Sequence, residues 1–272
     1  MSDAGARESV ARRFRARVEY DGTDFAGFQV NPGKRTVQGV LETALARLNG
    51  GVEGRVDGAG RTDAGVHASG QVIGFTYAGP LTTTDLGRAL DALLPPDVTV
   101  HGVRRAPDAF NPRYAARYRE YRYTVWNGPR SPLRERTALG VRVPLDTAAM
   151  ARAGSVLEGR HDFSAFGAVD RNPVRTVHSV RVRRSGSLVT IDVRADAFLR
   201  GMVRRIAAVL LEVGRGKMNE TGVRAALAAR VPALDGATAP AHGLSLRRVA
   251  LGRRVGKRTE RTERTEQETD ET

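Results

Sequence analysis

The chain has 272 residues, and its 44 Lys and Arg against 30 Asp and Glu give a formal net charge of +14. Because 40% of the residues are hydrophobic, the chain can build a packed core and wholesale disorder is excluded. It has no cysteine, which excludes disulfides, thiolate zinc sites and thiol nucleophiles, and its five histidines are scattered without metal-binding spacing.

The positive charge lies outside the last part of the chain. Residues 253–272 hold six basic and six acidic side chains, so the excess belongs to the preceding body. A basic body attracts polyanions such as nucleic acids. A genomic preference for Arg would change the ratio of Arg to Lys without creating net charge, so we favour nucleic acid as the partner. No apolar run approaches the roughly 18 residues of a membrane span, and residues 1–13 lack a signal-peptide core. We therefore expect a cytoplasmic protein.

Hydrophobic periodicity and turn residues predict five elements in the first half of the chain. Alternation of apolar and polar residues is typical of half-buried strands, and Asp21-Gly22 supplies a turn after the first one. Apolar residues at helical spacing are followed by stops at Asn49-Gly50-Gly51 and Pro95-Pro96. Strands are expected over 14–20, 71–77 and 98–103, and helices over 37–48 and 85–94.

The second half shows the same mixture of patterns. Ser185-Gly186 sits between two apolar runs and predicts a hairpin. A strongly amphipathic run ending at Gly214 predicts a helix whose polar side carries arginines. Strands are expected over 120–126, 178–182, 188–193 and 244–251, and the helix over 198–213. Interspersed strands and helices of this kind favour an α+β fold over a doubly wound parallel sheet.

Four segments are expected along the chain. Residues 1–12 are predicted to form a flexible arm, and the repetitive, charged residues 253–272 a disordered tail. Between them we expect an N-terminal α+β lobe over 13–105 and a C-terminal α+β lobe over 106–252.

One glycine-rich segment, Gly58–Ala68, combines residues with chemical potential: GAGRTDAGVHA. A cluster of this kind between strands is ordinarily only a turn. It does not fit a dinucleotide fingerprint, because Asp63 stands where the third glycine is needed, and it lacks the GK[ST] of a phosphate loop.

The segment closely resembles the GRTDAGVHA signature of the tRNA pseudouridine synthase A family. Further blocks resemble the family in the same order, and together they cover roughly residues 14–251. These blocks are Tyr20–Gln29, Thr36–Glu42, Phe110–Ala116, Arg119–Tyr123, Ala197–Gly214 and Gly243–Leu246.

The resemblance implies a two-lobed pseudouridine synthase fold, with a central mixed, largely antiparallel sheet flanked by helices and a catalytic cleft between the lobes. It also implies a homodimer that binds tRNA, and isomerisation of uridine to pseudouridine at positions 38, 39 and 40 of the anticodon stem-loop. The reaction changes neither composition nor oxidation level, so neither a metal nor another cofactor is expected.

By this resemblance Asp63 is the essential catalytic carboxylate, and Tyr121 is the tyrosine that packs on the uracil. The Tyr121 hydroxyl could also shuttle the C5 proton. Arg61 could pair with Asp63 or fill the space left by an extruded uridine. Whether Asp63 attacks C1′, adds to C6 or removes a ribose proton stays open, and Tyr123 is expected to be core.

Other side chains are weaker candidates. Leu244 and Leu246 could wall the pocket or belong to the core, and a structural role for His67 is as plausible as a functional one. Individually, the arginines near the motifs fit a solvated or structural charge better than a phosphate contact, although as a group they supply positive surface. We include two of them, Arg113 and Arg204, as substrate-binding candidates. The others are Arg119, Arg122, Arg200 and Arg205.

Three rival functions are considered. A non-catalytic RNA-binding protein would satisfy the composition but would not need Asp63, Arg61 and Tyr121 together. A pseudouridine synthase acting on another RNA would share the chemistry. A hydrolase is the weakest rival, since no GxSxG or paired-carboxylate pattern occurs.

Overall fold

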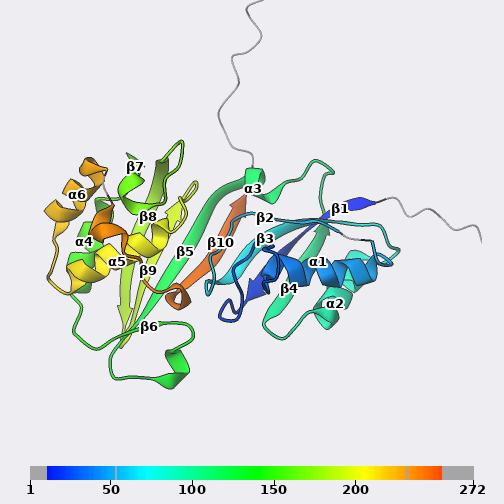
Figure 1. Ribbon diagram of the computed structural model, residues 1–272, viewed down its shortest axis with the longest axis horizontal. Coiled ribbons are helices and arrows are strands. Elements are labelled where there is room, and N and C mark those ends of the chain that lie inside the picture. Colours follow the sequence, from blue (N-terminus) through cyan, green and yellow to red (C-terminus); the bar gives the residue numbers. More distant parts are fainter. Residues whose placement is uncertain (1–10, 53, 231, 253–272) are drawn as a thin grey trace, which may run out of the picture.

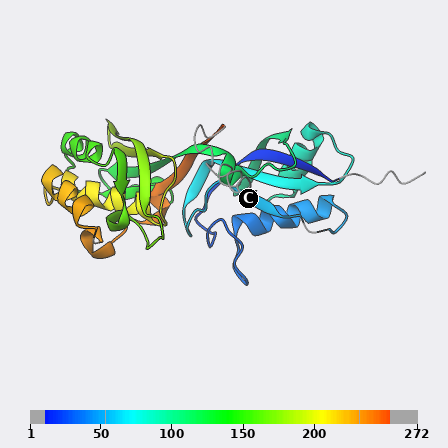
Figure 2. The ribbon, with the colours of Figure 1, turned by 90° about the horizontal axis from the view of Figure 1, so that it is seen from above.

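The computed structural model describes residues 11–52, 54–230 and 232–252. The predicted tail lies outside the described residues, and so does the predicted arm apart from Ala11 and Arg12. In Figures 1 and 2 the molecule is elongated, with the helices of the first half of the chain at one end and those of the second half at the other.

The first half folds as the periodicity predicts. Phe14, Ala16, Val18 and Tyr20 of the first strand are buried on one face, and the intervening residues are partly or fully exposed. The first helix begins after Thr36, whose hydroxyl accepts a hydrogen bond from the Gly39 amide. The elements are β1 (Arg12–Tyr20), α1 (Val37–Leu48), β2 (Val56–Gly58), β3 (His67–Tyr77), α2 (Thr83–Leu93) and β4 (Val98–Arg105).

The second half contains the predicted strands, the hairpin and the amphipathic helix, together with further short elements. Nine residues of the amphipathic helix are buried, which explains its strong sequence pattern. The elements are α3 (Pro112–Ala115), β5 (Ala116–Asn127), β6 (Leu139–Val141), α4 (Thr147–Ser155), β7 (Gly159–Asp162), β8 (Val174–Ser185), β9 (Leu188–Ala195), α5 (Met202–Gly214), α6 (Glu220–Ala229) and β10 (Leu244–Leu251).

Ten strands of the described chain form one sheet, in the order β4-β1-β3-β10-β5-β9-β8-β7, with β2 on β3 and β6 on β5. The pairs β3–β10 and β5–β6 are parallel and the other pairs are antiparallel. The expected mixed, largely antiparallel sheet of an α+β fold is therefore confirmed. The last strand, β10, lies between β3 and β5, so it joins the two halves of the sheet (Figure 1).

Two differences from the sequence prediction bear on the site. Helix α5 begins at Met202 rather than at Phe198, because Gly201 adopts a left-handed conformation with φ of 75° before it. The turn before α5 thereby leaves Phe198 outside the helix. The elements β2, β6, β7, α4 and α6 had no predicted counterpart.

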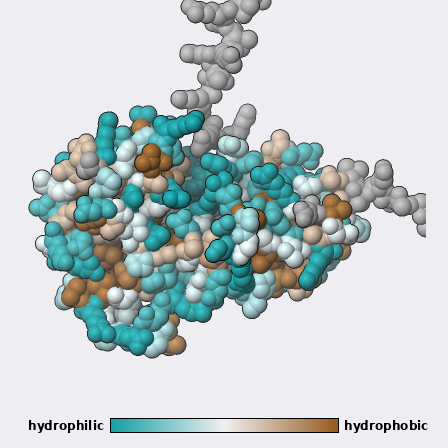
Figure 3. All heavy atoms as spheres, in the orientation of Figure 1, coloured by the Kyte–Doolittle hydropathy of each residue, from teal (hydrophilic) through white to brown (hydrophobic). Residues whose placement is uncertain are grey.

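Hydrophilic side chains cover much of the face shown in Figure 3, with apolar ones in scattered patches. Among the described residues no helix combines the length and apolar character that a membrane span requires.

Candidate active site

The loop that follows β2 carries the glycine-rich motif and is held against the sheet at its start. The Ala59 amide donates to the carbonyl of Val72 at 2.8 Å. Gln71 is fully buried, and its side chain donates to the carbonyl of Gly60 at 2.6 Å and accepts from the Gly60 amide at 3.3 Å. Paired bonds from one buried amide fix the backbone direction at the point where the loop leaves the sheet.

A second segment, the block Tyr20–Gln29, contacts the same loop at Thr62. The Phe28 amide donates to the carbonyl of Thr62 at 3.0 Å, and the hydroxyls of Thr62 and Tyr20 are 2.8 Å apart. Gly27 has a φ of 96°, and a Cβ there would lie 2.8 Å from the Thr62 carbonyl oxygen. Only glycine fits both conditions, so this block and the motif depend on each other.

Asp63 lies in the middle of the loop, with 39% of its side chain exposed. Its Oδ2 is 3.7 Å from Nη1 of Arg204, in the first turn of α5. Arg204 also donates through Nε to the carbonyl of Ala239 at 2.7 Å and through Nη2 to the hydroxyl of Thr238 at 3.0 Å. The carboxylate is thus accessible to a ligand, and a cation with a fixed orientation stands beside it.

Arg61 is exposed on the same loop. One of the two roles considered for Arg61 was pairing with Asp63. In the structure Arg204 makes that pair instead. The part of the chain described here contains no ion pair between Arg61 and Asp63. The Arg61 guanidinium is thus exposed two residues from Asp63 in sequence and remains available to a ligand.

Tyr121, on β5, is 7% exposed and meets the ring of Phe198 edge-on, with the centroids 5.2 Å apart. A Cβ at Gly60 would lie 3.5 Å from the Tyr121 hydroxyl, which places that hydroxyl against the start of the loop. Burial raises the pKa of Tyr121 to about 12; the charge of Arg119 opposes this shift and that of Asp63 adds to it. At neutral pH the side chain is therefore a phenol that can donate a proton, not a phenolate.

The two leucine candidates are both buried but differ in position. Leu246 lies directly opposite Tyr121 in the β10–β5 pair, and its Cδ2 is 3.9 Å from the Cβ position of Gly60. Leu244 is opposite Tyr123, two pairs further along. Tyr123 is fully buried and its hydroxyl donates to the Pro240 carbonyl at 2.9 Å, which confirms it as a core residue. Leu246 is therefore the leucine next to the loop.

Arg119 was a weak candidate for phosphate contact, and here the structural role prevails. The residue is 7% exposed, and its guanidinium donates to backbone carbonyls of three segments. It bonds the Ala59 carbonyl at 2.6 and 3.0 Å, the Asp196 carbonyl at 2.8 Å and the Arg113 carbonyl at 2.8 Å. One buried side chain therefore fixes the start of the Asp63 loop, the turn before Phe198, and helix α3. Nothing in the sequence distinguished Arg119 from a surface arginine.

Most of the other arginine candidates also have partners within the protein. Arg122 forms a bidentate pair with Asp192 at 2.7 and 2.9 Å, and Arg205 donates to the carbonyls of Gly236 and Gly167. Arg113 and Arg200 are exposed. Of these arginine candidates, Arg113 and Arg200 therefore remain the ones that are exposed enough to bind phosphate.

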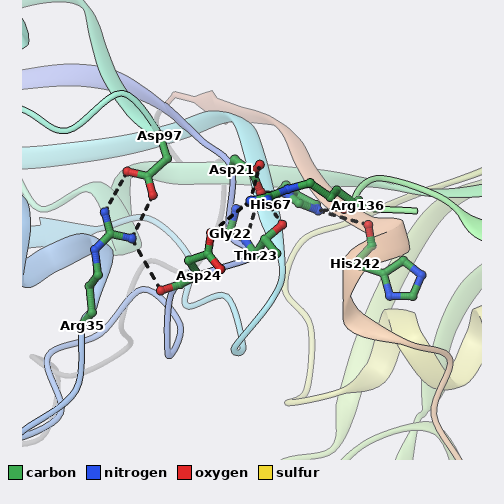
Figure 4. A network of polar contacts seen from close by, with 9 residues as sticks. All are labelled: Asp21, Gly22, Thr23, Asp24, Arg35, His67, Asp97, Arg136 and His242. Carbon is green, nitrogen blue, oxygen red and sulfur yellow. Dashed lines mark hydrogen bonds and ion pairs between the residues drawn. The ribbon is translucent and has the colours of Figure 1, made fainter. Parts of the chain in front are cut away.

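His67, which ends the motif, connects the loop to a wider polar network (Figure 4). Its Nδ1 accepts from the Gly22 amide at 3.0 Å, and its Nε2 lies 2.8 Å from the carbonyl oxygen of Arg136 and 3.1 Å from that of His242. Because Nδ1 accepts, Nε2 carries the proton and donates to these carbonyls. The ring is 8% exposed, so the structure supports the structural role of His67.

The same network holds the segment around Arg136 to the first half of the chain. The Arg136 guanidinium pairs with Asp21 at 3.3 Å and with Asp24 at 3.0 Å. Burial alone would raise the pKa of Asp21, but its two hydrogen bonds from Thr23 and the charge of Arg136 outweigh burial and lower it. These contacts hold the segments around His67, the residue at which the Asp63 loop ends.

Chemically, the site combines an accessible carboxylate, a fixed cation and a buried phenol beside an apolar wall. Such a set can bind a flat polar ring against Tyr121 and Leu246 while Asp63 acts on it as nucleophile or base. Among the described residues no group of three or more His, Asp or Glu side chains is placed to hold a metal ion.

Comparisons with known proteins show which family the chain belongs to. The family model described as tRNA pseudouridine synthase matches residues 16–115 and 153–250. The chain is 42% identical over 237 residues to tRNA pseudouridine synthase A of Halalkalibacterium halodurans, covering 86% of this chain and 90% of that protein. It is 44% identical over 242 residues to the protein of the same name from Myxococcus xanthus, covering 87% and 91%. The match extends over both halves of the fold and over the loop of Asp63, and the chain belongs to the tRNA pseudouridine synthase family.

Proposed function

We propose that this isomerase converts uridine to pseudouridine in tRNA, with Asp63 as its essential carboxylate. The observation that carries the assignment is the position of Asp63, which is accessible, lies 3.7 Å from the guanidinium of Arg204 and adds through its charge to the raised pKa of the buried Tyr121. The net charge of +14 supports a polyanionic substrate.

The reaction breaks the bond from C1′ to N1 of the base and forms a bond from C1′ to C5. The proton on C5 leaves and N1 gains one, so the product is an isomer and no redox partner is required. Asp63 would act at C1′, at C6 or on a ribose proton. The Tyr121 hydroxyl is a phenol at neutral pH, so it would shuttle the C5 proton: it would take up this proton while passing its own on toward N1.

A uridine in a stem must leave the base stack before a carboxylate can reach it. In our proposal the extruded uracil lies on Tyr121 and Leu246, Leu244 extends the wall, and Arg61 either occupies the vacated position or contacts the backbone. Arg113 would bind a phosphate. Arg204 would orient Asp63, and it would contact the substrate only from its place beside that carboxylate.

Within tRNA, the proposed sites of modification are positions 38, 39 and 40 of the anticodon stem-loop. This part of the proposal rests on likeness to relatives named tRNA pseudouridine synthase A. We further propose a cytoplasmic homodimer, and lobes over 13–105 and 106–252 with the catalytic cleft between them. A synthase for another RNA would share Asp63 and Tyr121, so the substrate must be tested separately from the chemistry.

The deciding experiment compares Asp63→Asn with wild type for both tRNA affinity and pseudouridine formation mapped by position. The amide keeps size and hydrogen bonding but cannot act as a nucleophile or base. We expect activity to fall by at least about a thousandfold, with affinity changed by only a small factor. Asp108→Asn, an exposed carboxylate elsewhere, is the matched control for charge.

Each outcome selects among the alternatives. Wild-type activity in Asp63→Asn would remove Asp63 from the chemistry. Modification at other tRNA positions, or only in ribosomal RNA, would overturn the anticodon assignment while leaving the reaction intact. Binding of tRNA by the wild-type protein without any pseudouridine would favour the binding-module rival.

A further inference from the structure

Tyr114 presents a large ring to solvent on a very short helix. It is the third residue of α3, and 71% of it is exposed, although the helix is anchored by the buried Pro112. Single exposed apolar residues are common and need no explanation by themselves. Three features distinguish Tyr114: the hydrogen bonds of the backbone around it, the link of its helix to the loop of Asp63, and the exposed arginines close to it in sequence.

The backbone on both sides of Tyr114 is hydrogen-bonded. The Asn111 side chain accepts from the Arg113 amide at 3.0 Å, and the Ala115 amide donates to the Asn111 carbonyl at 2.9 Å. The Ala115 carbonyl in turn accepts from the Gly252 amide at 3.1 Å. A ring on such a fixed support loses little further backbone entropy when it binds a ligand, which is the condition for an efficient anchor.

The support is shared with the active site. Arg119 donates to the carbonyl of Arg113 in α3 and to the carbonyl of Ala59, where the Asp63 loop begins. The two segments are therefore attached to one buried guanidinium. Helix α3 is therefore attached, through one side chain, to the start of the loop that carries Asp63.

The charged residues closest to Tyr114 in sequence are positive. Arg113 precedes Tyr114 and Arg117 follows it by three residues, and both are exposed. Within the described part of the chain neither guanidinium has a carboxylate partner. An exposed aromatic ring between two available cations matches one kind of ligand well: a nucleobase that stacks while its flanking phosphates are neutralised.

We propose that Tyr114 is a stacking platform for an unpaired nucleobase of the RNA substrate, with Arg113 and Arg117 holding the phosphates on either side. This inference rests on the proposed function, because it takes the ligand to be the RNA bound at Asp63. The base on Tyr114 is a different one from the uracil proposed to lie on Tyr121, since Tyr121 is buried and Tyr114 is exposed on another element.

The first test uses fluorescence. The chain has a single Trp, Trp126, so Tyr114→Trp adds one reporter at the platform, and the wild-type titration gives the signal of Trp126 alone. We expect an anticodon stem-loop RNA to quench the added fluorescence by stacking, and heparin, which has charge but no bases, to leave it unchanged. Equal signals for RNA and heparin would overturn stacking.

The second test uses kinetics and affinity. Tyr114→Ala should raise the Kd and KM for tRNA about tenfold, the usual size of a lost base stack, with kcat at saturation nearly unchanged. Tyr114→Phe should behave as wild type. Leu133→Ala, at an apolar residue that is 93% exposed on another segment, is the matched control.

The outcomes separate this inference from the proposed function. If wild type makes pseudouridine but Tyr114→Ala has an unchanged Kd and Tyr114→Trp is not quenched, the platform alone is wrong. If Tyr114→Trp is quenched by RNA that wild type never modifies, the platform stands and the proposed function fails. A loss of self-association in Tyr114→Ala would assign the ring to a protein interface and overturn the inference.

Discussion

The guanidinium of Arg204 stands 3.7 Å from the carboxylate of Asp63, and the two residues come from opposite halves of the chain. Asp63 lies in the loop after β2, and Arg204 lies in the first turn of α5. Contacts with Ala239 and Thr238 fix the arginine independently of Asp63. The cation therefore keeps its place when a substrate arrives, and it can orient the carboxylate without being displaced.

Replacing this cation should impair turnover more than binding. We expect Arg204→Gln to lower kcat about 10- to 100-fold, because a misoriented catalytic group loses much of its effectiveness, while the Kd for tRNA rises only a few-fold. Arg200→Gln removes the same charge from an exposed position close in sequence and should leave kcat unchanged. Single-turnover rates and filter-binding affinities for both variants check this. Parallel losses in the two variants would mean that Arg204 acts only through net charge.

Tyr121→Phe should separate the hydroxyl from the ring. The phenylalanine can keep the edge-on contact with Phe198, so the packing around this ring and the affinity for tRNA should survive. Turnover should fall about 10- to 100-fold, the scale of one general acid–base group. Tyr123→Phe, which loses a buried hydroxyl outside the site, is the matched control and should cost about 1 kcal/mol of stability with turnover kept. Unchanged turnover in Tyr121→Phe would leave Tyr121 with a packing role alone.

Arg119 should couple stability to activity. Arg119→Met leaves the carbonyls of Ala59, Asp196 and Arg113 without this donor, and each unsatisfied buried group costs about 1–3 kcal/mol. Arg119→Lys keeps the charge but has too few directed donors to bond three carbonyls at once. We expect lower urea midpoints for both variants, and reduced kcat at temperatures where they remain folded. Full activity in a folded Arg119→Met would show that the Asp63 loop does not need this support.

The sequence predicted the elements that bury a regular apolar stripe and missed those that do not. Helix α5 buries nine residues and was found, whereas α4 buries only Met150, Ala153 and Gly154 and has no strong pattern. The strands β2 and β6 have three residues each, too few to show a period. Gly201 moved the start of α5, and nothing in the apolar spacing indicated this.

The candidate site was predicted as far as its motif extends. Asp63 and Tyr121 followed from resemblance, and the structure places them at one site. The partner of Asp63 did not follow, because the guanidinium of Arg204 approaches it only after α5 has packed on the sheet. Arg119 and Arg113 looked alike as basic residues near a motif, yet one is buried among carbonyls and the other is exposed. Burial distinguishes the two arginines, and it depends on the whole fold.

Three buried tyrosines lead to a prediction about alkaline pH. Burial raises the pKa of Tyr20, Tyr121 and Tyr123 above the usual value of about 10, to about 12 for Tyr121. Below pH 10 both the folded and the unfolded chain keep these protons, so the three groups do not make stability depend on pH. Between about pH 10 and 12 the unfolded chain releases protons that the folded chain retains, so the unfolded state binds fewer protons and stability falls as pH rises.

The expected slope is about 1.4 kcal/mol per pH unit for each tyrosine that stays protonated in the fold. Urea unfolding at a series of pH values above 9, with phenolate absorbance recorded alongside, measures it. Tyr123→Phe should reduce the slope by the share of one tyrosine, whereas Tyr114→Phe, which removes the hydroxyl of an exposed ring, should not. A stability that stays level from pH 9 to about 11.5, or phenolate that forms before unfolding, would contradict the burial of these rings. A slope that fell equally in both variants would have to come from groups other than the three tyrosines.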